Sequence, residues 1–414
     1  MKVVFVTQPW DGIGSGSSLG ILTCNLINRI PAETDVIIAA KNGRCETPAR
    51  NIRYIYLNYK IDKLIEKLLK AVEKPGFFNK KSNPHFSSVF YYFFYIFVLS
   101  LKLKNEKPDI IHIYNFSQFV PVIRFFNPAA KIILNMHCEW LSQISRKKIS
   151  KRLENTDLVI GCSNYISRKI SERFPEYRDK IITVPNATDP YTARRKRDSQ
   201  DKTKRILFVG RISPEKGIHT LIEAFNIVEN KIPDSRLDLI GSIKTIPLDF
   251  IIGMDQNNEV QKLTRFYGKE SYFSQLEKMI NQTAYSKVKF HNHKNREELE
   301  DFYNNADIVV NPSLSESFGM AVIEANSFGV PVIVTKTGGM DELVENGKNG
   351  FKVSPSDPEK LADKILLLLE NKELNESMGE QGLAFVTANF SWDVISEILL
   401  TSYSNLLKAK GNPD

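Results

Sequence analysis

Short apolar runs alternate with longer amphipathic stretches along most of the chain. The runs have the length of β-strands, and the stretches between them show helical periodicity. The expected strands are 2–7, 35–40, 52–57, 109–114, 131–136, 158–162 and 181–184, then 205–210, 236–240, 287–290, 307–310 and 331–335. Strands that alternate with helices form parallel βαβ units. The pattern therefore predicts an α/β protein with two doubly wound, Rossmann-like domains that face a cleft.

A change in composition separates the two series of strands. Residues 185–204 contain proline and a basic run but almost no large apolar residue, which is typical of a linker. We expect an N-terminal domain over 1–190, a linker over 191–204 and a C-terminal domain over 205–392. Within the second domain, 242–274 is long, polar and irregular, and we interpret it as an insertion.

The aromatic-rich segment 86–103 is flanked by lysines at positions 80, 81, 102, 104 and 107. Its length is borderline for a membrane span, which needs roughly 20 apolar residues. The interpretation that we favour is a buried helix packed on the first sheet. A helix lying in the membrane interface and a true span are the alternatives.

The net charge of +8 is unevenly distributed. Residues 1–200 hold 32 Lys and Arg against 17 Asp and Glu, whereas the remainder holds 24 against 31. The basic clusters 146–152 and 194–197 suit an anionic membrane surface or a lipid-linked phosphate. Solvated helix faces and a charged linker are the alternative. Nucleic acid is disfavoured as a partner because the basic half lacks a recognisable reading motif.

The cysteines at positions 24, 45, 138 and 162 lie far apart and show no C-x-x-C spacing. This distribution argues against a zinc module or a disulfide scaffold and fits a reducing compartment. The short apolar start breaks at Pro9 and lacks the features of a signal peptide. We therefore expect a cytoplasmic protein, either free or peripheral on the cytoplasmic face of the membrane.

Two loops that follow predicted strands carry candidate phosphate-binding residues, because ligands of doubly wound sheets bind at strand ends. The first loop contains Gly14 and Gly16, where backbone N–H groups can approach phosphate or sugar oxygens. The second contains Arg211 and Lys216, which can hold a diphosphate from two sides and stabilise charge on a leaving nucleotide. A flexible or solvated turn is the alternative for each.

A third loop contains Glu316, and Glu324 follows within the next predicted helix. A carboxylate among apolar helical neighbours is costly unless it accepts hydrogen bonds, which sugar hydroxyls can supply. The amides of Phe318, Gly319 and Met320 at the helix start suit an anion or a hydroxyl. A favourable N-terminal charge at Glu316 and a structural salt bridge at Glu324 are the alternatives.

Taken together, these motifs resemble the retaining GT-B glycosyltransferases of family 4. The resemblance rests on Gly210-Arg211, on Glu215-Lys216-Gly217 and on Glu316-x7-Glu324. The supporting positions are Pro185-Asn186, Pro312-Ser313, Gly338-Gly339 with Glu342, and Phe390-Ser391-Trp392. The resemblance covers nearly the whole chain and is strongest over 205–353.

The resemblance implies roles for these residues and for His137, which matches a histidine that faces the reacting sugar in relatives. In this assignment the cations hold the donor diphosphate, Glu324 binds the ribose, and Glu316 contacts the transferred sugar. The implied catalytic residues are Glu316, His137, Arg211 and Lys216. The implied donor-binding residues are Gly14, Gly16, Arg211, Lys216, Phe318, Gly319, Met320 and Glu324. A C-terminal helix over 393–414 is expected to pack back on the N-terminal, acceptor-side domain.

We therefore expect a hexosyltransferase-type enzyme that moves a sugar from a UDP- or GDP-linked donor to a hydroxyl acceptor with retention of configuration. The acceptor is a glycan, a lipid-linked molecule or a small molecule. Rival hypotheses are a nucleotide-sugar epimerase of GT-B fold and a non-catalytic, basic membrane- or nucleic-acid-binding protein.

No cofactor and no metal are expected, since relatives are generally metal-independent and the chain lacks D-x-D spacing. His291 and His293, the only close histidine pair, are expected to line the nucleotide base rather than to bind metal. Ala187 and Asn292-His293 depart from the family pattern, and these departures leave the base and the sugar of the donor open.

Overall fold

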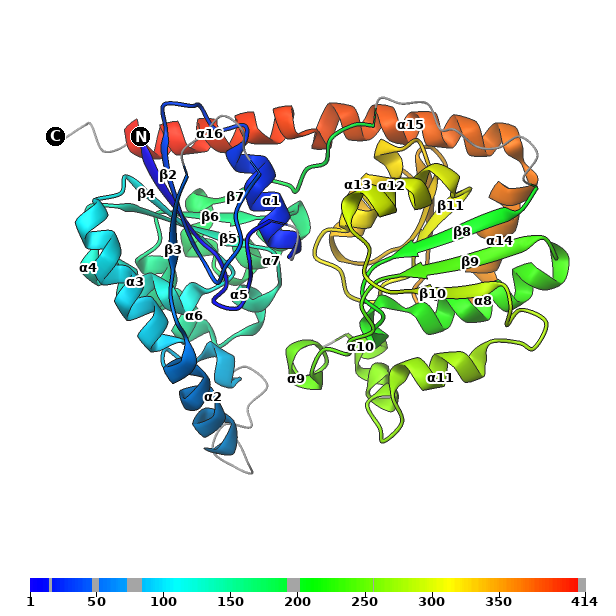
Figure 1. Ribbon diagram of the computed structural model, residues 1–414, viewed down its shortest axis with the longest axis horizontal. Coiled ribbons are helices and arrows are strands. Elements are labelled where there is room, and N and C mark those ends of the chain that lie inside the picture. The colour runs from blue at the N-terminus through cyan, green and yellow to red at the C-terminus, as the bar shows by residue number, and fades with distance from the viewer. Residues whose placement is uncertain (15–16, 47–51, 73–83, 192–201, 256, 409–414) are drawn as a thin grey trace. The chain divides into compact units, whose positions relative to one another are not determined.

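The computed structural model describes residues 1–14, 17–46, 52–72, 84–191, 202–255 and 257–408. The chain divides into two compact units. Unit 1 is Met1–Asn186 with Trp392–Asp414, and unit 2 is Ala187–Ser391. Each unit contains one parallel sheet with helices packed on both of its faces (Figure 1). The predicted fold class, two doubly wound α/β sheets, is therefore confirmed.

Unit 1 is built on a seven-stranded sheet. Its strands are β1 (Lys2–Val6), β2 (Asp35–Ala40), β3 (Ile52–Tyr56), β4 (Ile110–Tyr114), β5 (Lys131–Met136), β6 (Leu158–Gly161) and β7 (Ile181–Thr183). Its helices are α1 (Ser18–Ile27), α2 (Lys60–Val72), α3 (Phe93–Glu106), α4 (Val120–Phe126), α5 (Trp140–Gln143), α6 (Arg146–Glu154), α7 (Asn164–Arg173) and α16 (Trp392–Lys408). The strand order is β3-β2-β1-β4-β5-β6-β7, so it reverses between β1 and β4.

Unit 2 is built on a six-stranded sheet. Its strands are β8 (Lys204–Val209), β9 (Ser235–Ile240), β10 (Val288–His291), β11 (Ile308–Asn311), β12 (Val332–Thr335) and β13 (Gly350–Val353). Its helices are α8 (Ile218–Lys231), α9 (Leu248–Ile251), α10 (Asn258–Lys262), α11 (Tyr272–Met279), α12 (Arg296–Asn305), α13 (Met320–Ser327), α14 (Pro358–Glu370) and α15 (Lys372–Phe390). The order β10-β9-β8-β11-β12-β13 reverses between β8 and β11.

Every predicted strand is confirmed to within one residue at each end. The apolar runs were easy to recognise because parallel strands covered on both faces are buried along their whole length. Strand β13 was missed. It pairs with β12 through Ile333 and Phe351, but its sequence of glycine, two apolar residues and a lysine contains no apolar run that periodicity could detect.

The expectation that 242–274 is irregular was wrong. This stretch contains α9, α10 and the start of α11, and Val260, Leu263 and Phe266 join the hydrophobic core of unit 2. Polar residues and glycine separate these very short helices, so their apolar positions do not fall on a single amphipathic face in the sequence. The stretch therefore contributes to the core of the domain.

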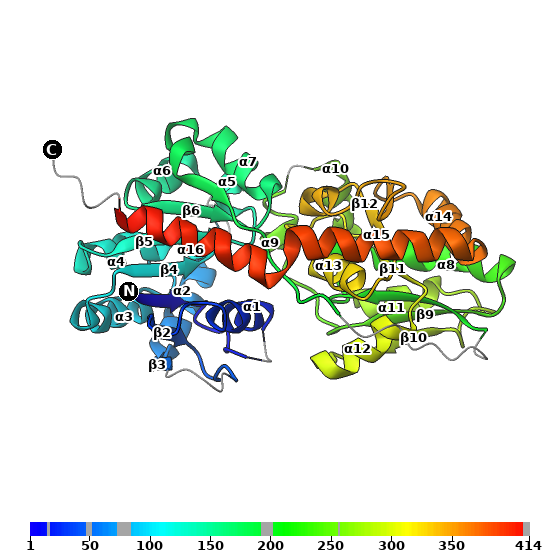
Figure 2. The same cartoon turned by 90° about the horizontal axis from the view of Figure 1, so that it is seen from above.

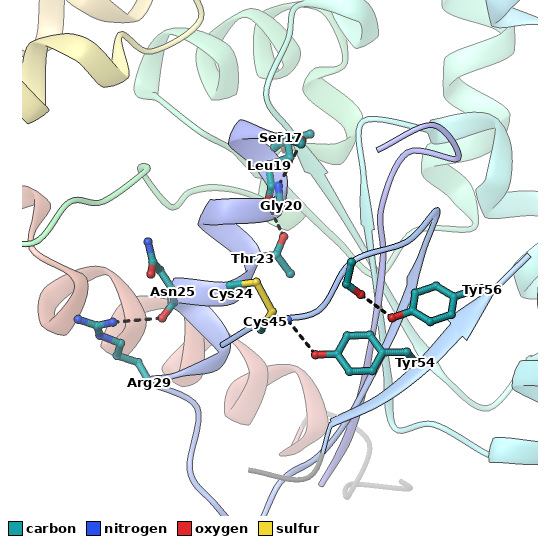
Figure 3. The surroundings of a disulfide bond; sticks show 11 residues. Ser17, Leu19, Gly20, Thr23, Cys24, Asn25, Arg29, Cys45, Tyr54 and Tyr56 are labelled. Atoms are coloured by element: carbon teal, nitrogen blue, oxygen red, sulfur yellow. Dashed lines mark hydrogen bonds between the residues drawn. A yellow bond between two sulfur atoms is a disulfide. The ribbon is translucent and has the colours of Figure 1, made fainter. Parts of the chain in front are cut away.

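The cysteine spacing argued against a disulfide scaffold, but Cys24 and Cys45 form a disulfide (Figure 3). The bond joins α1 to the loop after β2 across a sequence separation of 21 residues. Closing a loop of this length stabilises a fold by about 3 kcal/mol in the chain-entropy model. Spacing alone did not show that the fold brings the two residues together. With this disulfide, the cysteines no longer favour a reducing compartment.

The aromatic segment 86–103 does not form one continuous buried helix. It contains a short 3₁₀ turn (His85–Ser87) and most of α3. Tyr95 and Leu99 are buried, as a core helix requires, whereas Phe94 is 46% exposed. Among the residues that the structure describes, no helix is long and apolar enough to cross a membrane. The favoured interpretation, a buried helix packed on the first sheet, is therefore right for one face of α3 only.

Helix α16 packs on the unit 1 sheet, as Figure 2 shows from above. The hydroxyl of Tyr403 lies 2.7 Å from Nδ1 of His112 on β4, and both side chains are buried. At the other end of α16, the guanidinium of Arg29 on the loop after α1 lies over the ring of Trp392. These contacts attach the last helix to the first unit.

Candidate functional site

The ends of β8 and β11 lie where the strand order of unit 2 reverses. Open α/β sheets bind ligands just beyond the carboxyl ends of the strands at such a point. The loop after β8 carries Arg211 and Lys216, and the loop after β11 carries Glu316. A hydrogen bond from the backbone N–H of Leu314 to the carbonyl oxygen of Glu215, 2.8 Å long, joins the two loops. Motifs that are far apart in the sequence therefore form one site.

Gly217 makes the close approach of these two loops possible. Its φ of +68° lies in the left-handed region. A Cβ atom at this position would lie 2.0 Å from the carbonyl oxygen of Pro312. Only glycine satisfies both demands, and the start of α8 can therefore lie directly against the loop that carries Glu316.

The carboxylate of Glu215 orients the side chain of Arg211. Its Nε lies 3.6 Å from Oε1 of Glu215, a buried residue in the same loop. The hydroxyl of Ser213 donates a 2.5 Å hydrogen bond to the same carboxylate oxygen. The side chain of Arg211 remains 37% exposed. The loop thus contacts one edge of the guanidinium, and a substantial part of the Arg211 side chain remains accessible to solvent.

Lys216 forms an ion pair with Glu316, with 2.6 Å between Nζ and Oε2. The two side chains are 16% and 18% exposed, so neither is enclosed. Lys216 ends a 3₁₀ turn (Pro214–Lys216) that begins with a proline, which fixes the backbone from which the ammonium group projects. The pair places opposite charges side by side at the switch point.

Two glycines from the loop after β12 set the position of Glu316. Gly338 has φ +56°, and a Cβ atom on it would lie 1.8 Å from the carbonyl oxygen of Glu316. The backbone N–H of Gly339 donates a 3.1 Å hydrogen bond to that oxygen. The backbone of the Glu316 loop therefore rests directly on the glycine pair.

Phe318, Gly319 and Met320 lie at the start of α13, as the sequence predicted. Gly319 occupies the N-cap position with φ +111°, and no side chain caps the helix. The amide groups of a helix N-terminus carry a partial positive charge. This end of α13 is therefore electropositive and lies immediately after Glu316 in the chain.

Glu324 lies on α13 and accepts a 2.8 Å hydrogen bond from the hydroxyl of Tyr303 on α12. Desolvation raises the pKa of the Glu324 carboxyl above its usual range, while the bond from Tyr303 opposes this shift. Tyr303 stacks on Phe328, and Phe328 stacks on Tyr191 with ring centroids 4.2 Å apart. An aromatic stack thus orients the hydroxyl that contacts Glu324.

In unit 1, the glycine-rich loop after β1 is attached to the loop after β2. The N–H of Ile13 donates a 2.8 Å hydrogen bond to the carbonyl oxygen of Asn42. Gly14 has φ +86°, and a Cβ atom on it would lie 2.8 Å from the carbonyl oxygen of Arg44. Gly16 lies outside the described residues. Burial raises the pKa of Asp11, at the start of the loop, to about 6.

His137 follows β5, and its backbone N–H donates a 2.6 Å hydrogen bond to Oδ1 of Asn115. Desolvation lowers the pKa of His137 to about 4, so its imidazole is neutral at pH 7. Its Nε2 atom is buried and has no hydrogen-bond partner within the described part of the chain. Asn115, which follows β4 with φ +60°, fixes the backbone at His137 from the neighbouring strand.

His291, one member of the close histidine pair, has a carboxylate partner. Its Nε2 lies 2.6 Å from Oδ1 of Asp238 on the adjacent strand β9. Arg236 contacts the same oxygen at 2.8 Å. Within the ranges that the structure describes, no three His, Cys, Asp or Glu side chains gather in a way that could hold a metal ion.

Two family models match consecutive parts of the chain. The model described as Glycosyltransferase Family 4 matches residues 35–191, and the model described as Glycosyl transferases group 1 matches residues 191–384. The chain belongs to glycosyltransferase family 4. It is therefore an enzyme that transfers a sugar, and its two units have the GT-B fold.

Relatives of this family 4 enzyme include proteins with different names. Spore coat protein SA of Bacillus subtilis is 26% identical over 73% of this chain and 80% of its own length. The glycogen synthase of Mycobacterium tuberculosis is 24% identical over 75% of this chain and 72% of its own length. The crystal structure of Anabaena HepE in complex with UDP matches the fold with a TM-score of 0.69 at 17% identity, over 98% of this chain and all of that one.

Sequence reasoning placed the motifs of the family but missed two residues that support them. Tyr303 stands alone in an amphipathic helix, so nothing in the sequence links it with Glu324. Asn115 could have been recognised, because it directly follows a fully buried strand in the manner of the other candidate residues.

Gly338→Ala is expected to lower kcat/KM at least 100-fold, because a new methyl group would displace the backbone of Glu316, and misplacement by about 1 Å can cost that much. Gly347→Ala is the matched control. Gly347 also has a left-handed φ, +84°, but nothing lies within 4 Å of its added Cβ. The control should lose only about 1 kcal/mol of stability. Steady-state kinetics and thermal unfolding of both variants test this, and equal activities would contradict it.

Proposed function

We propose that this glycosyltransferase moves a sugar from a UDP- or GDP-linked donor to a hydroxyl acceptor with retention of anomeric configuration and without a cofactor. The observation that carries this proposal is the meeting of Arg211, Lys216 and Glu316 at the switch point of unit 2. Two cations at this point match the charge of a diphosphate. Anabaena HepE, which has the same fold, was crystallised in complex with UDP, and this supports a nucleotide donor.

In this proposal the donor diphosphate replaces the Glu316 carboxylate as the partner of Lys216. The ammonium group then contacts a phosphate oxygen, and Arg211 contributes a planar fork of N–H donors. Released from Lys216, the carboxylate of Glu316 accepts hydrogen bonds from hydroxyls of the transferred sugar. The ion pair thus holds both side chains close to the positions in which the donor needs them.

The reaction breaks the bond between the anomeric carbon and the leaving phosphate oxygen and forms a bond from that carbon to the acceptor oxygen. Retention follows when the acceptor attacks from the side that the phosphate leaves. The acceptor proton passes to the leaving phosphate. The fixed cations lower the barrier because negative charge grows on the diphosphate as the bond breaks.

Unit 1 is the proposed acceptor-side unit. His137 would contact the reacting sugar as a neutral imidazole, since its lowered pKa of about 4 leaves it uncharged at pH 7. A neutral ring can donate one hydrogen bond and accept another. Its proposed role is therefore to orient a hydroxyl, with the backbone amides of the Gly14 loop as further donors.

The test is a panel of UDP- and GDP-sugars, with acceptors from the glycan, lipid-linked and small-molecule classes. Nucleotide release is measured by a coupled assay, and the anomeric configuration of the product by NMR. We expect acceptor-dependent release of one nucleotide and a product with the donor's configuration. An isomerised sugar without nucleotide release would indicate an epimerase. An inverted product would refute retention, and calorimetric titrations without binding of either nucleotide would refute the donor assignment.

A further inference from the structure

Exposed apolar side chains are concentrated on one part of unit 1. Ten of the seventeen large apolar residues that are exposed within the described ranges lie on α2, on α3 and the turn before it, and on α4. They are Ile61, Leu64, Leu68, Val89, Phe90, Phe94, Phe97, Val98, Leu101 and Phe125, and we call them the α2–α4 patch. A concentration of this kind indicates a surface that meets an apolar partner.

The spacing of these residues places them in stripes. Ile61, Leu64 and Leu68 recur at intervals of three and four residues, so they share one face of α2. Phe94, Phe97, Val98 and Leu101 do the same along α3, whose opposite face carries the buried residues. Each helix therefore presents an apolar stripe to solvent, which folding of this chain alone does not explain.

The helices of the patch are joined to one another. The carboxylate of Asp62 on α2 accepts hydrogen bonds from the backbone N–H groups of Phe94 and Tyr95 at 2.9 and 3.1 Å, and so binds the first turn of α3. The ring of Phe97 on α3 meets that of Phe126 on α4 edge-on at 5.5 Å. Figure 1 shows α4, α3 and α2 following one another along one side of unit 1. The patch is thus a single surface.

Lysines accompany the stripe on α2. Lys60, Lys63 and Lys67 are exposed and directly precede Ile61, Leu64 and Leu68 in the sequence, so a basic stripe runs beside the apolar one. The helix contributes little opposing charge, because Asp62 is buried and Glu66 is half-buried. On α3, Lys102 and Lys104 are exposed as well. An apolar surface bordered by lysines is complementary to anionic lipid.

In the basic cluster 146–152 that the sequence suggested, the two arginines have partners within unit 1, whereas Lys147 and Lys151 are exposed. Arg146 contacts Glu176 at 2.8 Å. Arg152 is buried and donates a 2.6 Å hydrogen bond to the carbonyl oxygen of Ser87, in the turn before α3. The cluster 194–197 and the lysines at 80 and 81 lie outside the described residues. Arg152 therefore cannot contribute to a cationic surface.

We propose that the α2–α4 patch docks on an anionic lipid bilayer, with the phenylalanine and leucine side chains entering the headgroup region and the lysines contacting lipid phosphates. A second copy of the chain is a poorer partner, because two such faces would bring their lysines together. Docking of the patch on a bilayer requires neither the donor nor catalysis. The membrane proposal can therefore be tested independently of the proposed reaction.

Vesicle flotation tests this proposal. The chain should float with vesicles of phosphatidylcholine and phosphatidylglycerol and bind pure phosphatidylcholine at least tenfold more weakly. Leu64→Ser/Phe94→Ser/Phe97→Ser should reduce binding at least tenfold. The matched control is Tyr285→Ser/Leu367→Ser/Ile398→Ser, which removes apolar side chains of similar exposure, 58%, 38% and 40%, outside the patch, and it should bind like the wild type.

Charge and depth are tested separately. Lys60→Gln/Lys63→Gln/Lys67→Gln should weaken binding to anionic vesicles by up to fivefold for each lysine, whereas Lys360→Gln/Lys372→Gln should not. Brominated lipids should quench the fluorescence of the tryptophan introduced in a Phe94→Trp variant, because this position lies in the patch. They should not quench the tryptophan introduced in Leu367→Trp, which lies outside it. Thermal unfolding confirms that each variant is folded.

Wild-type protein that stays at the bottom of the gradient with anionic vesicles would overturn the proposal. Equal binding by the patch variant and its control would do the same. A dimer in analytical ultracentrifugation that only the patch variant loses would identify a second copy as the partner instead. Nucleotide binding, measured on the same samples by thermal shift, reports on the proposed reaction independently of these outcomes.

Discussion

Lys216→Ala is expected to lower kcat about 100- to 1,000-fold in a protein that remains folded. In the proposed reaction the ammonium group stabilises charge that develops on the leaving diphosphate, and removal of one such group from a preorganised site typically costs about 2.7–4 kcal/mol of transition-state stabilisation. The loss of stability should stay below about 3–5 kcal/mol, the cost of removing one partner of a fully buried pair, because both side chains keep some contact with solvent.

Lys287→Ala is the matched control for this substitution. It removes the lysine of another lysine–glutamate pair, in which Nζ lies 2.5 Å from Oε1 of Glu229. That pair lies at the start of β10, away from the carboxyl ends of β8 and β11. Initial rates at saturating donor and melting temperatures are measured for both variants. If Lys216→Ala is as active as Lys287→Ala, the diphosphate is not held by this lysine.

Glu324→Gln is expected to weaken donor binding about 10- to 100-fold while making the protein more stable at neutral pH. The donor's ribose hydroxyls would donate charge-assisted hydrogen bonds to the carboxylate, each contributing about 1.5–3 kcal/mol. Calorimetric titration with the nucleotide measures the loss. Glu223→Gln is the control, because desolvation also raises the pKa of this half-buried glutamate on α8, and it should leave nucleotide affinity unchanged.

The raised pKa of Glu324 determines how both the stability of the fold and the affinity for the donor change with pH. The folded chain favours the protonated carboxyl, so stability is greatest below the ordinary pKa of glutamate and is lost as the pH rises through the raised value. Glutamine does not ionise, so the variant should escape this loss. Donor affinity of the wild type should increase over the same rise in pH, because the ionised form accepts the hydrogen bonds. The variant should show no such increase.

Tyr303→Phe separates the role of the tyrosine from that of Glu324 itself. The hydroxyl of Tyr303 lowers the pKa of the carboxyl by donating a hydrogen bond to it. Without that bond the pKa should rise further, and the increase of donor affinity should move to higher pH. An unchanged pH profile would mean that Tyr303 only fills space.

The candidate site was largely predictable because its motifs follow strands. Apolar runs located β8 and β11, and the rules for parallel sheets place the residues after such strands at the binding edge. The sequence alone therefore identifies Arg211, Lys216 and Glu316 as candidates. The ion pair between Lys216 and Glu316 could not be predicted, because it depends on how closely Gly217 allows the two loops to approach.

The sequence by itself determined most elements of this protein and their order, since local periodicity and turn residues specify strands and helices. The exceptions are β13 and the short helices within 242–274, which lack a recognisable apolar pattern. Tertiary structure alone decided which distant residues meet. It paired Cys24 with Cys45, placed the Tyr303 hydroxyl on Glu324 and joined α2 to α3 through Asp62. Tertiary structure also decided that α3 presents an apolar stripe to solvent. An apolar residue in a sequence predicts burial, but only packing decides which face of a helix the sheet can cover.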